Sequence, residues 1–212
     1  MTDRGFLFEV SWEVCNKVGG IYTVISSKVP AAMREYGENY FLLGPDLKNN
    51  PEFEETDEAC WESLREALAM REVVFRLGRW KIPGRPKVVL VSFARNLNKD
   101  HVLYELWESY GVDSIAGGWD YEEPVLFSYT CGIAVETIYN VVVRPQGARA
   151  AAHFHEWMCG AGLLCIKKRL PEIGTVLTPH ATMLGRTLAG SGMDIYTKMD
   201  EISPQNEAVT YN

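Results

Sequence analysis

Short apolar runs alternate with longer, helix-like stretches along most of this chain. The apolar runs are nearly continuous, as is typical of strands that are buried on both faces of a parallel sheet. They lie at residues 6–10, 40–44, 73–77, 88–93, 150–154 and 175–178. Helix-like stretches occupy residues 21–36, 57–70, 100–110, 124–143 and 157–169. This alternation predicts an α/β fold with a doubly wound, mostly parallel sheet.

Composition excludes several other classes of protein. The chain has 212 residues, of which 47% are hydrophobic, so it can bury a core and is too apolar to be disordered. Its net charge of −7 argues against sequence-blind nucleic-acid binding, which needs a basic surface. The longest largely apolar run, residues 138–143, is too short to cross a membrane.

The cysteine pattern and the first ten residues indicate in which cellular compartment the protein is found. The five cysteines are scattered, odd in number and without a CxxC spacing, which indicates reduced thiols rather than a disulfide framework. The first ten residues, MTDRGFLFEV, do not have the basic region and apolar core of a signal peptide. Together these features predict a cytoplasmic protein.

A glycine pair follows the first predicted strand in the segment NKVGGI, residues 16–21. Gly19 and Gly20 let backbone N–H groups approach a ligand, and the helix that begins here adds partial positive charge. Lys17 adds a full charge, so a phosphate or diphosphate is the natural ligand. The segment is neither a GxGxxG fingerprint nor a P-loop. The alternative interpretation is a tight strand-to-helix turn with an exposed lysine.

Two histidines, His153 and His155, end the fifth predicted strand in the segment AHFHEW. Residues two apart in a strand face the same side, so their rings should point together. Open α/β sheets bind ligands at this end of their strands, which favours hydrogen bonding to a sugar or phosphate. Zinc is an alternative, but the sequence offers no clear third ligand. A purely structural role for one histidine is a second alternative.

A third polar segment, TPHATMLGR at residues 178–186, follows the last predicted strand. His180 and Arg186 can converge there on an anionic group, with the guanidinium offering a bidentate fork. The acidic segment 52–58 is predicted to be a solvated loop or a helix start. The sequence assigns no partner to Glu13 or Glu136.

Four segments, in this order along the chain, closely resemble the eukaryotic-type glycogen synthases. They are FEVSWEVCNKVGGIYTV, ENYFLLGP, AHFHEWMCGAGL and TPHATMLGR. The resemblance implies a GT-B glycosyltransferase, in which two Rossmann-like domains face a cleft. Residues 1–212 would form a single N-terminal, acceptor-side domain, and the nucleotide-binding C-terminal domain would lie outside this chain. We therefore expect these residues alone to be inactive.

The family transfers glucose from UDP-glucose to the non-reducing end of an α-1,4-glucan, with retention and without a metal or other cofactor. The resemblance implies that Lys17 and the Gly19–Gly20 loop meet the donor diphosphate, while His180 and Arg186 touch UDP-glucose. It places His155 near the sugar, with His153 beside it. Lys17, His155 and Arg186 are the predicted catalytic residues.

The implied partners are a nucleotide sugar and glycogen or another α-1,4-glucan, with homo-oligomers of the full-length protein and no nucleic acid or membrane. Two other functions stay open. One is a non-catalytic module that binds glucan or a sugar phosphate. The other is a GT-B synthase that uses ADP-glucose, because the donor base is recognised by the second domain.

Overall fold

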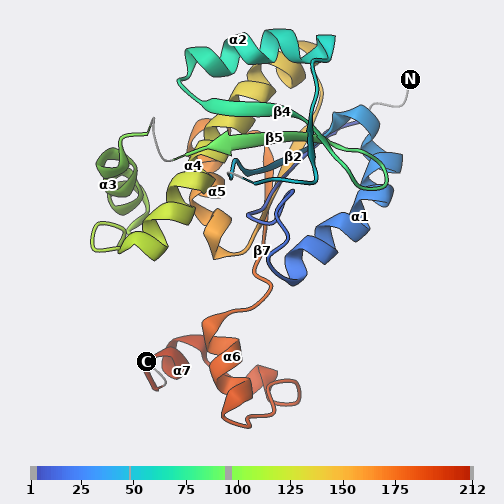
Figure 1. Ribbon diagram of the computed structural model, residues 1–212. Coiled ribbons are helices and arrows are strands. Elements are labelled where there is room, and N and C mark those ends of the chain that lie inside the picture. The colour runs from blue at the N-terminus through green and yellow to red at the C-terminus, as the bar shows by residue number, and fades with distance from the viewer. Residues whose placement is uncertain (1–3, 48, 94–96, 211–212) are drawn as a thin grey trace. The chain divides into compact units, whose positions relative to one another are not determined.

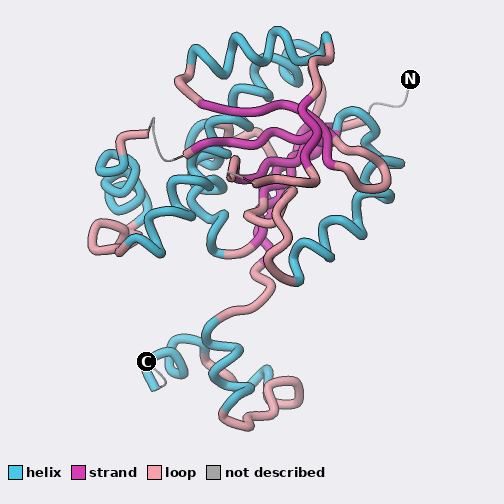
Figure 2. The backbone as a smooth tube through the Cα atoms, viewed as in Figure 1, coloured by secondary structure: helices cyan, strands magenta, loops and turns pink. Residues whose placement is uncertain are grey.

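The computed structural model describes residues 4–47, 49–93 and 97–210, which form two compact units that meet at Thr178 and Pro179. The first unit contains one seven-stranded sheet, drawn in magenta in Figure 2. Its strands are β1 (Phe6–Val10), β2 (Tyr40–Pro45), β3 (Phe53–Glu55), β4 (Val74–Trp80), β5 (Lys87–Ser92), β6 (Ala150–His155) and β7 (Gly174–Thr178).

The strand order is β3-β4-β5-β2-β1-β6-β7. The pairs from β5 through β7 are parallel, whereas β4 is antiparallel to both of its neighbours. This order confirms the predicted doubly wound, mostly parallel α/β fold, which is Rossmann-like. The short strand β3 lies in the acidic segment that we expected to be a loop or a helix start.

Helices cover both faces of the sheet. The first unit contains α1 (Gly20–Tyr36), α2 (Glu62–Met70), α3 (Lys99–Tyr110), α4 (Trp119–Ile138) and α5 (Gly160–Arg169). Figure 1 shows α1 on one side of the sheet and α4 and α5 on the other. Each face has its own core, because alternate strand residues point to opposite sides. Phe8 thus packs toward the α4 and α5 side, and Leu42 toward α1.

The central helix α4 starts at Trp119, earlier than the predicted start at residue 124, and continues as a π-helical turn over Tyr139–Val143. Asp120 and Glu122 in its first turn complement the helix dipole, and Pro124 lies inside the helix. The stretch Trp119–Gln146 is long and apolar enough to cross a membrane by length and composition, but 78% of its most apolar window is buried within the protein. It is therefore a core helix of this fold.

The second unit, Pro179–Asn212, contains α6 (Met183–Gly190) and α7 (Pro204–Thr210). Neither helix was predicted from the sequence. Thr182 caps α6, because its hydroxyl accepts a hydrogen bond from the Gly185 N–H at 3.0 Å.

Candidate functional site

The connections reverse direction at β1, which lies between β2 and β6 in the sheet. The chain runs from β1 outward to β2 on one side and returns to β6 on the other, so the carboxyl ends of β1 and β6 form a topological switch point. Ligands of open α/β sheets bind in the crevice at such a point. Lys17, Gly19 and Gly20 follow β1, and His155 ends β6. The sheet thus brings two of the predicted segments to neighbouring strand ends.

The loop between β1 and α1 is folded around Glu13. This buried carboxylate accepts hydrogen bonds from the N–H groups of Gly19 and Tyr22, at 2.7 and 2.8 Å. Glu13, for which the sequence suggested no partner, therefore caps α1 from the preceding loop. It also takes up the Gly19 N–H that we expected to bind a phosphate.

Lys17 and Gly20 lie on the exposed side of the same loop. The Lys17 ammonium is 5.4 Å from the centre of the Tyr22 ring, a cation–π contact that holds it beside the start of α1. A Cβ added to Gly20 would meet no atom within 4 Å, so this glycine faces open space. An anion that approaches the N-terminus of α1 would therefore meet Lys17 and the backbone at Gly20 before it met Glu13.

His153 and His155 point to the same side of the sheet, as their spacing predicted, with ring centroids 4.1 Å apart. Their surroundings differ. The His155 side chain is 1% exposed and its Nε2 lies 2.7 Å from Glu9 Oε1, whereas the His153 side chain is 20% exposed. His153 Nε2 lies 2.8 Å from the Thr178 hydroxyl on β7. In the first unit, the ring of His155 is thus enclosed and that of His153 is partly open.

Glu9 is the centre of this cluster, and it was not among the site residues predicted from the sequence. The carboxylate is fully buried on β1 and contacts His155, the Lys28 ammonium of α1 and the Tyr40 hydroxyl of β2. Burial by itself raises the pKa of Glu9. The hydrogen bonds from His155, Lys28 and Tyr40 and the charge of Lys28 outweigh that effect and lower the pKa to about 2. Glu9 is therefore ionised, and the same environment raises the pKa of Tyr40.

Glu9, His153 and His155 also satisfy the spacing of a metal site, because their potential ligand atoms lie within 4.8 Å of one another. Glu9 is thus a possible third ligand, for which the sequence offered no clear candidate. Lys28 already brings a positive charge to that position, since its ammonium contacts Glu9 and lies 3.4 Å from His153 Nδ1. The Lys28 ammonium therefore already balances the negative charge of Glu9.

The residue after His155 has an unusual backbone conformation. Glu156 has φ 66° and ψ 166°, a region that glycine occupies and other residues rarely do. Its N–H donates to the Thr178 carbonyl at 2.9 Å, which helps to hold the strained peptide. Such conformations concentrate at functional sites. Strain at the end of β6, beside the switch point, therefore supports a functional role for the HFHEW segment.

His180 and Arg186 belong to the second unit, where both are exposed and Arg186 lies in α6. Their convergence on an anionic group stays a prediction. The role of every other predicted site residue also stays a prediction.

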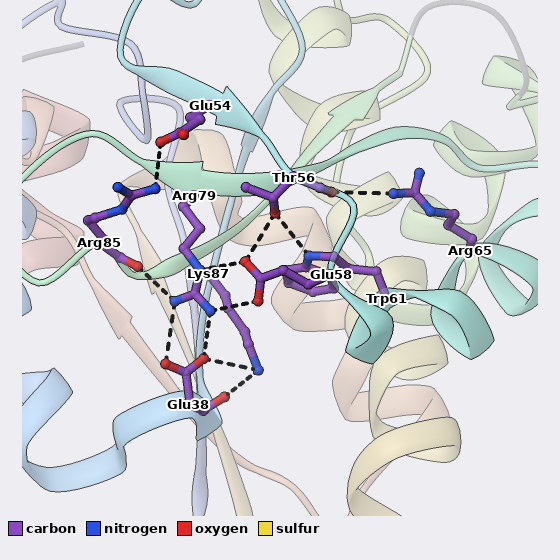
Figure 3. Close-up of polar contacts among 9 residues, drawn as sticks. All are labelled: Glu38, Glu54, Thr56, Glu58, Trp61, Arg65, Arg79, Arg85 and Lys87. Atoms are coloured by element: carbon purple, nitrogen blue, oxygen red, sulfur yellow. Dashed lines mark hydrogen bonds and ion pairs between the residues drawn. The ribbon is translucent and has the colours of Figure 1, made fainter.

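A second polar cluster lies near the amino ends of β2 and β5, away from the switch point (Figure 3). Arg79 on β4 binds the carboxylates of Glu38 and Glu58 at 2.9 and 2.7 Å, and Lys87 at the start of β5 also contacts Glu38. These pairs join β4 and β5 to the segment after α1 and to the loop between β3 and α2. Their charges are mutually satisfied, which indicates a structural network. Glu136, the other acid without a predicted partner, similarly pairs with Arg71 and Arg169.

Comparison with known proteins identifies the family. The glycogen synthase family model matches residues 9–211. The liver glycogen [starch] synthase of Rattus norvegicus is 37% identical over 207 residues, which cover 95% of this chain and 29% of the relative. The glycogen [starch] synthase of Dictyostelium discoideum is 34% identical over 98% of this chain and 24% of the relative.

Isoform 1 of the Saccharomyces cerevisiae glycogen [starch] synthase is 35% identical over 95% of this chain and 30% of the relative. The chain thus spans less than a third of the length of the curated relatives that it matches. The family match covers the switch-point loops of the first unit and α6 of the second. The fold and these matches together show that the chain belongs to the glycogen synthase family and corresponds to its N-terminal domain.

Proposed function

We propose that the protein to which this chain belongs is a retaining glucosyltransferase, a glycogen synthase. It transfers glucose from UDP-glucose to the non-reducing end of an α-1,4-glucan. The observation that carries this proposal is the family match over residues 9–211, together with the Lys17–Gly20 loop and the HFHEW segment at neighbouring strand ends. A second domain of the GT-B type completes the site, so residues 1–212 alone are inactive.

The proposed roles follow from how charge develops during glucosyl transfer. As the bond between sugar and diphosphate breaks, negative charge grows on the leaving group. Lys17 and Arg186 stabilise that charge, and the backbone at Gly19 and Gly20 lines the approach to it. Glu13 supports this arrangement, because it fixes the loop that carries Lys17.

The sugar becomes cation-like at the same time, so hydrogen bonds from uncharged groups suit its hydroxyls. His180 makes such contacts in the proposal, with His155 and His153 near the sugar. The Glu9 carboxylate orients His155 from behind, since its oxygen lies 2.7 Å from Nε2 of that ring. No metal or other cofactor takes part. The partners are a nucleotide sugar and a glucan, and the full-length protein is a cytoplasmic homo-oligomer.

Two other functions remain as alternatives. A donor with adenine instead of uracil would make the protein an ADP-glucose-dependent synthase. A module that only binds glucan or a sugar phosphate would use the same exposed groups without turnover. One assay distinguishes these two functions from the proposed one.

The assay follows labelled glucose from UDP-glucose, and in parallel from ADP-glucose, into glycogen. It uses the protein encoded by the full reading frame, with Lys17→Ala and Arg186→Ala. Each variant should lose about 10²–10³-fold in rate, as expected when one preorganised charge contact to a developing anion is removed. Lys81→Ala removes an exposed lysine in the turn before β5 and should retain wild-type activity.

Transfer from ADP-glucose alone would replace the proposed donor. A folded protein that binds glycogen but transfers glucose from neither donor would establish the binding module instead. Full activity in both Lys17→Ala and Arg186→Ala would remove these residues from the mechanism.

A further inference from the structure

A cavity of about 530 Å³ lies at the amino ends of β1 and β6, the end of the sheet away from the switch point. It lies between the start of these strands and the last turn of α1. Arg4, Arg34 and Arg149 line it, together with Tyr36, Phe6 and Ala150. One hollow is therefore lined by three exposed arginines that come from three separate segments of the chain.

These arginines differ from the others in the same unit. The remaining arginines of the first unit whose placement is described are each paired with a carboxylate: Arg65, Arg71, Arg76, Arg79, Arg85, Arg144 and Arg169. Among the described residues, Arg4, Arg34 and Arg149 form no ion pair within 4.0 Å. Among the residues that the structure describes, the first unit thus pairs its other arginines with carboxylates and gives no such partner to the three at this cavity.

This gathering is unexpected on electrostatic grounds. The chain carries a net charge of −7, with 28 acidic residues against 21 basic ones, so carboxylates are plentiful. Glu35 also lines the cavity, but it forms no ion pair with a described guanidinium group. Positive charges that gather at one hollow repel one another, and a bound anion relieves that repulsion more fully than the single carboxylate of Glu35 can.

We propose that this cavity binds the phosphate group of a small phosphorylated molecule. Arginine matches phosphate because its planar fork donates two parallel hydrogen bonds. The volume falls within the range of small-molecule sites, about 300–1,000 Å³, and leaves room for an organic part beside the phosphate. Buried Phe6 and the neighbouring Ala150 offer that part an apolar floor, and Tyr36 an aromatic wall.

This site is distinct from the one proposed for the donor diphosphate. The cavity lies at the amino ends of β1 and β6, whereas Lys17 and the glycine pair follow the carboxyl end of β1. The two sites share α1, which runs from Gly20 at one end to Tyr36 at the other. Phosphate binding at this cavity does not depend on the proposed glucosyl transfer.

Titration calorimetry tests the proposal with two probes, inorganic phosphate and phenyl phosphate. Arg34→Ala and Arg149→Ala should each weaken binding of phenyl phosphate about ten-fold or more, because each removes a charge-assisted contact. Arg144→Ala is the matched control. It removes the same charge from the surface segment just before Arg149, where the guanidinium pairs with Glu172 outside the cavity. Lys17→Ala tests the other phosphate-binding candidate.

Circular dichroism and thermal unfolding establish that each variant is folded. Saturable binding that survives Arg144→Ala and Lys17→Ala but is weakened by both cavity variants supports the proposal. Tighter binding of phenyl phosphate than of phosphate supports an organic part beside the phosphate group, and equal affinity contradicts that part of the proposal. The proposal is overturned if the wild-type chain shows no saturable binding. Equal weakening in Arg144→Ala, or loss in Lys17→Ala alone, also overturns it.

Discussion

A carboxylate in the middle of an apolar strand, Glu9, ties together three elements of the fold. It contacts Lys28 of α1, Tyr40 of β2 and His155 of β6, and it has no exposed surface. An ionised group in such a place is stable only when it is paired and hydrogen-bonded, because the loss of hydration is otherwise too costly. The cluster therefore fixes the position of His155 and makes the fold sensitive to acid.

The expected acid sensitivity has a definite direction. The pKa of Glu9 is about 2 in the folded protein against an ordinary value of 4.5, so its charged form is favoured by folding. The resulting stabilisation is present above about pH 4.5 and is lost as the pH falls toward 2. Its full size is on the order of 3 kcal/mol. Urea unfolding between pH 7 and pH 3 should show a smaller loss of unfolding free energy with acid in Glu9→Gln than in wild type.

Glu62→Gln is the control, because it removes a carboxylate from the exposed side of α2. This change should alter the pH dependence less than Glu9→Gln does. Identical pH dependence in wild type and Glu9→Gln would show that the buried pairing does not stabilise the folded state.

The sequence predicted part of this cluster. Because strand side chains alternate, the spacing of His153 and His155 was enough to predict that they share a face. Their partner Glu9 could not be predicted, since its contact with His155 depends on how β1 pairs with β6 and on where α1 packs. A glutamate flanked by apolar residues in FLFEV was the available signal, because a buried strand rarely keeps an unpaired charge.

At the scale of elements, α4 and α5 approach each other closely through glycine. A Cβ added to Gly162 would lie 2.3 Å from the Ser128 carbonyl oxygen, so the backbones would have to separate. The Gly162 N–H also donates to the Ser128 hydroxyl at 2.6 Å. This contact positions α5, which follows the HFHEW segment directly.

Gly162→Ala should therefore lower the unfolding free energy by about 1–3 kcal/mol, the usual cost of overpacking a core. Gly160→Ala provides a control in the same helix, because a Cβ there would meet nothing within 4 Å. It should be neutral or stabilising by up to about 1 kcal/mol, since alanine favours the helix more than glycine does. Equal effects of the two changes in urea unfolding would contradict the close approach of α4 and α5.

Helix boundaries were harder to predict than the helices themselves. The predicted helix at 157–169 begins at Gly160, because Trp157–Cys159 forms a 3-10 turn after the strained Glu156. The predicted helix at 57–70 begins at Glu62 for a similar reason, since Ala59–Trp61 is also a 3-10 turn. Periodicity marks which residues face the core, but the first turn depends on contacts outside the helix.

At the scale of the whole molecule, the parallel centre of the sheet was predictable and its edge was not. Apolar strands such as β2 are buried on both faces, which gives a strong sequence signal. The edge strand β3 has three residues, two of them acidic, and it forms only because β4 offers a partner. The helices of the second unit were missed because they are short and bury little.

The division into two units predicts that the first one folds without the second. Both hydrophobic core clusters lie before Pro179, and Leu188 is the one buried hydrophobic residue among those described after it. A chain that ends at Thr178 should therefore unfold cooperatively, with a midpoint within a few degrees of the 212-residue chain by circular dichroism. A peptide of residues 179–212 should show little helix, because short isolated helices are marginal in water. Non-cooperative unfolding of the shortened chain would show that the second unit supplies part of the core stability.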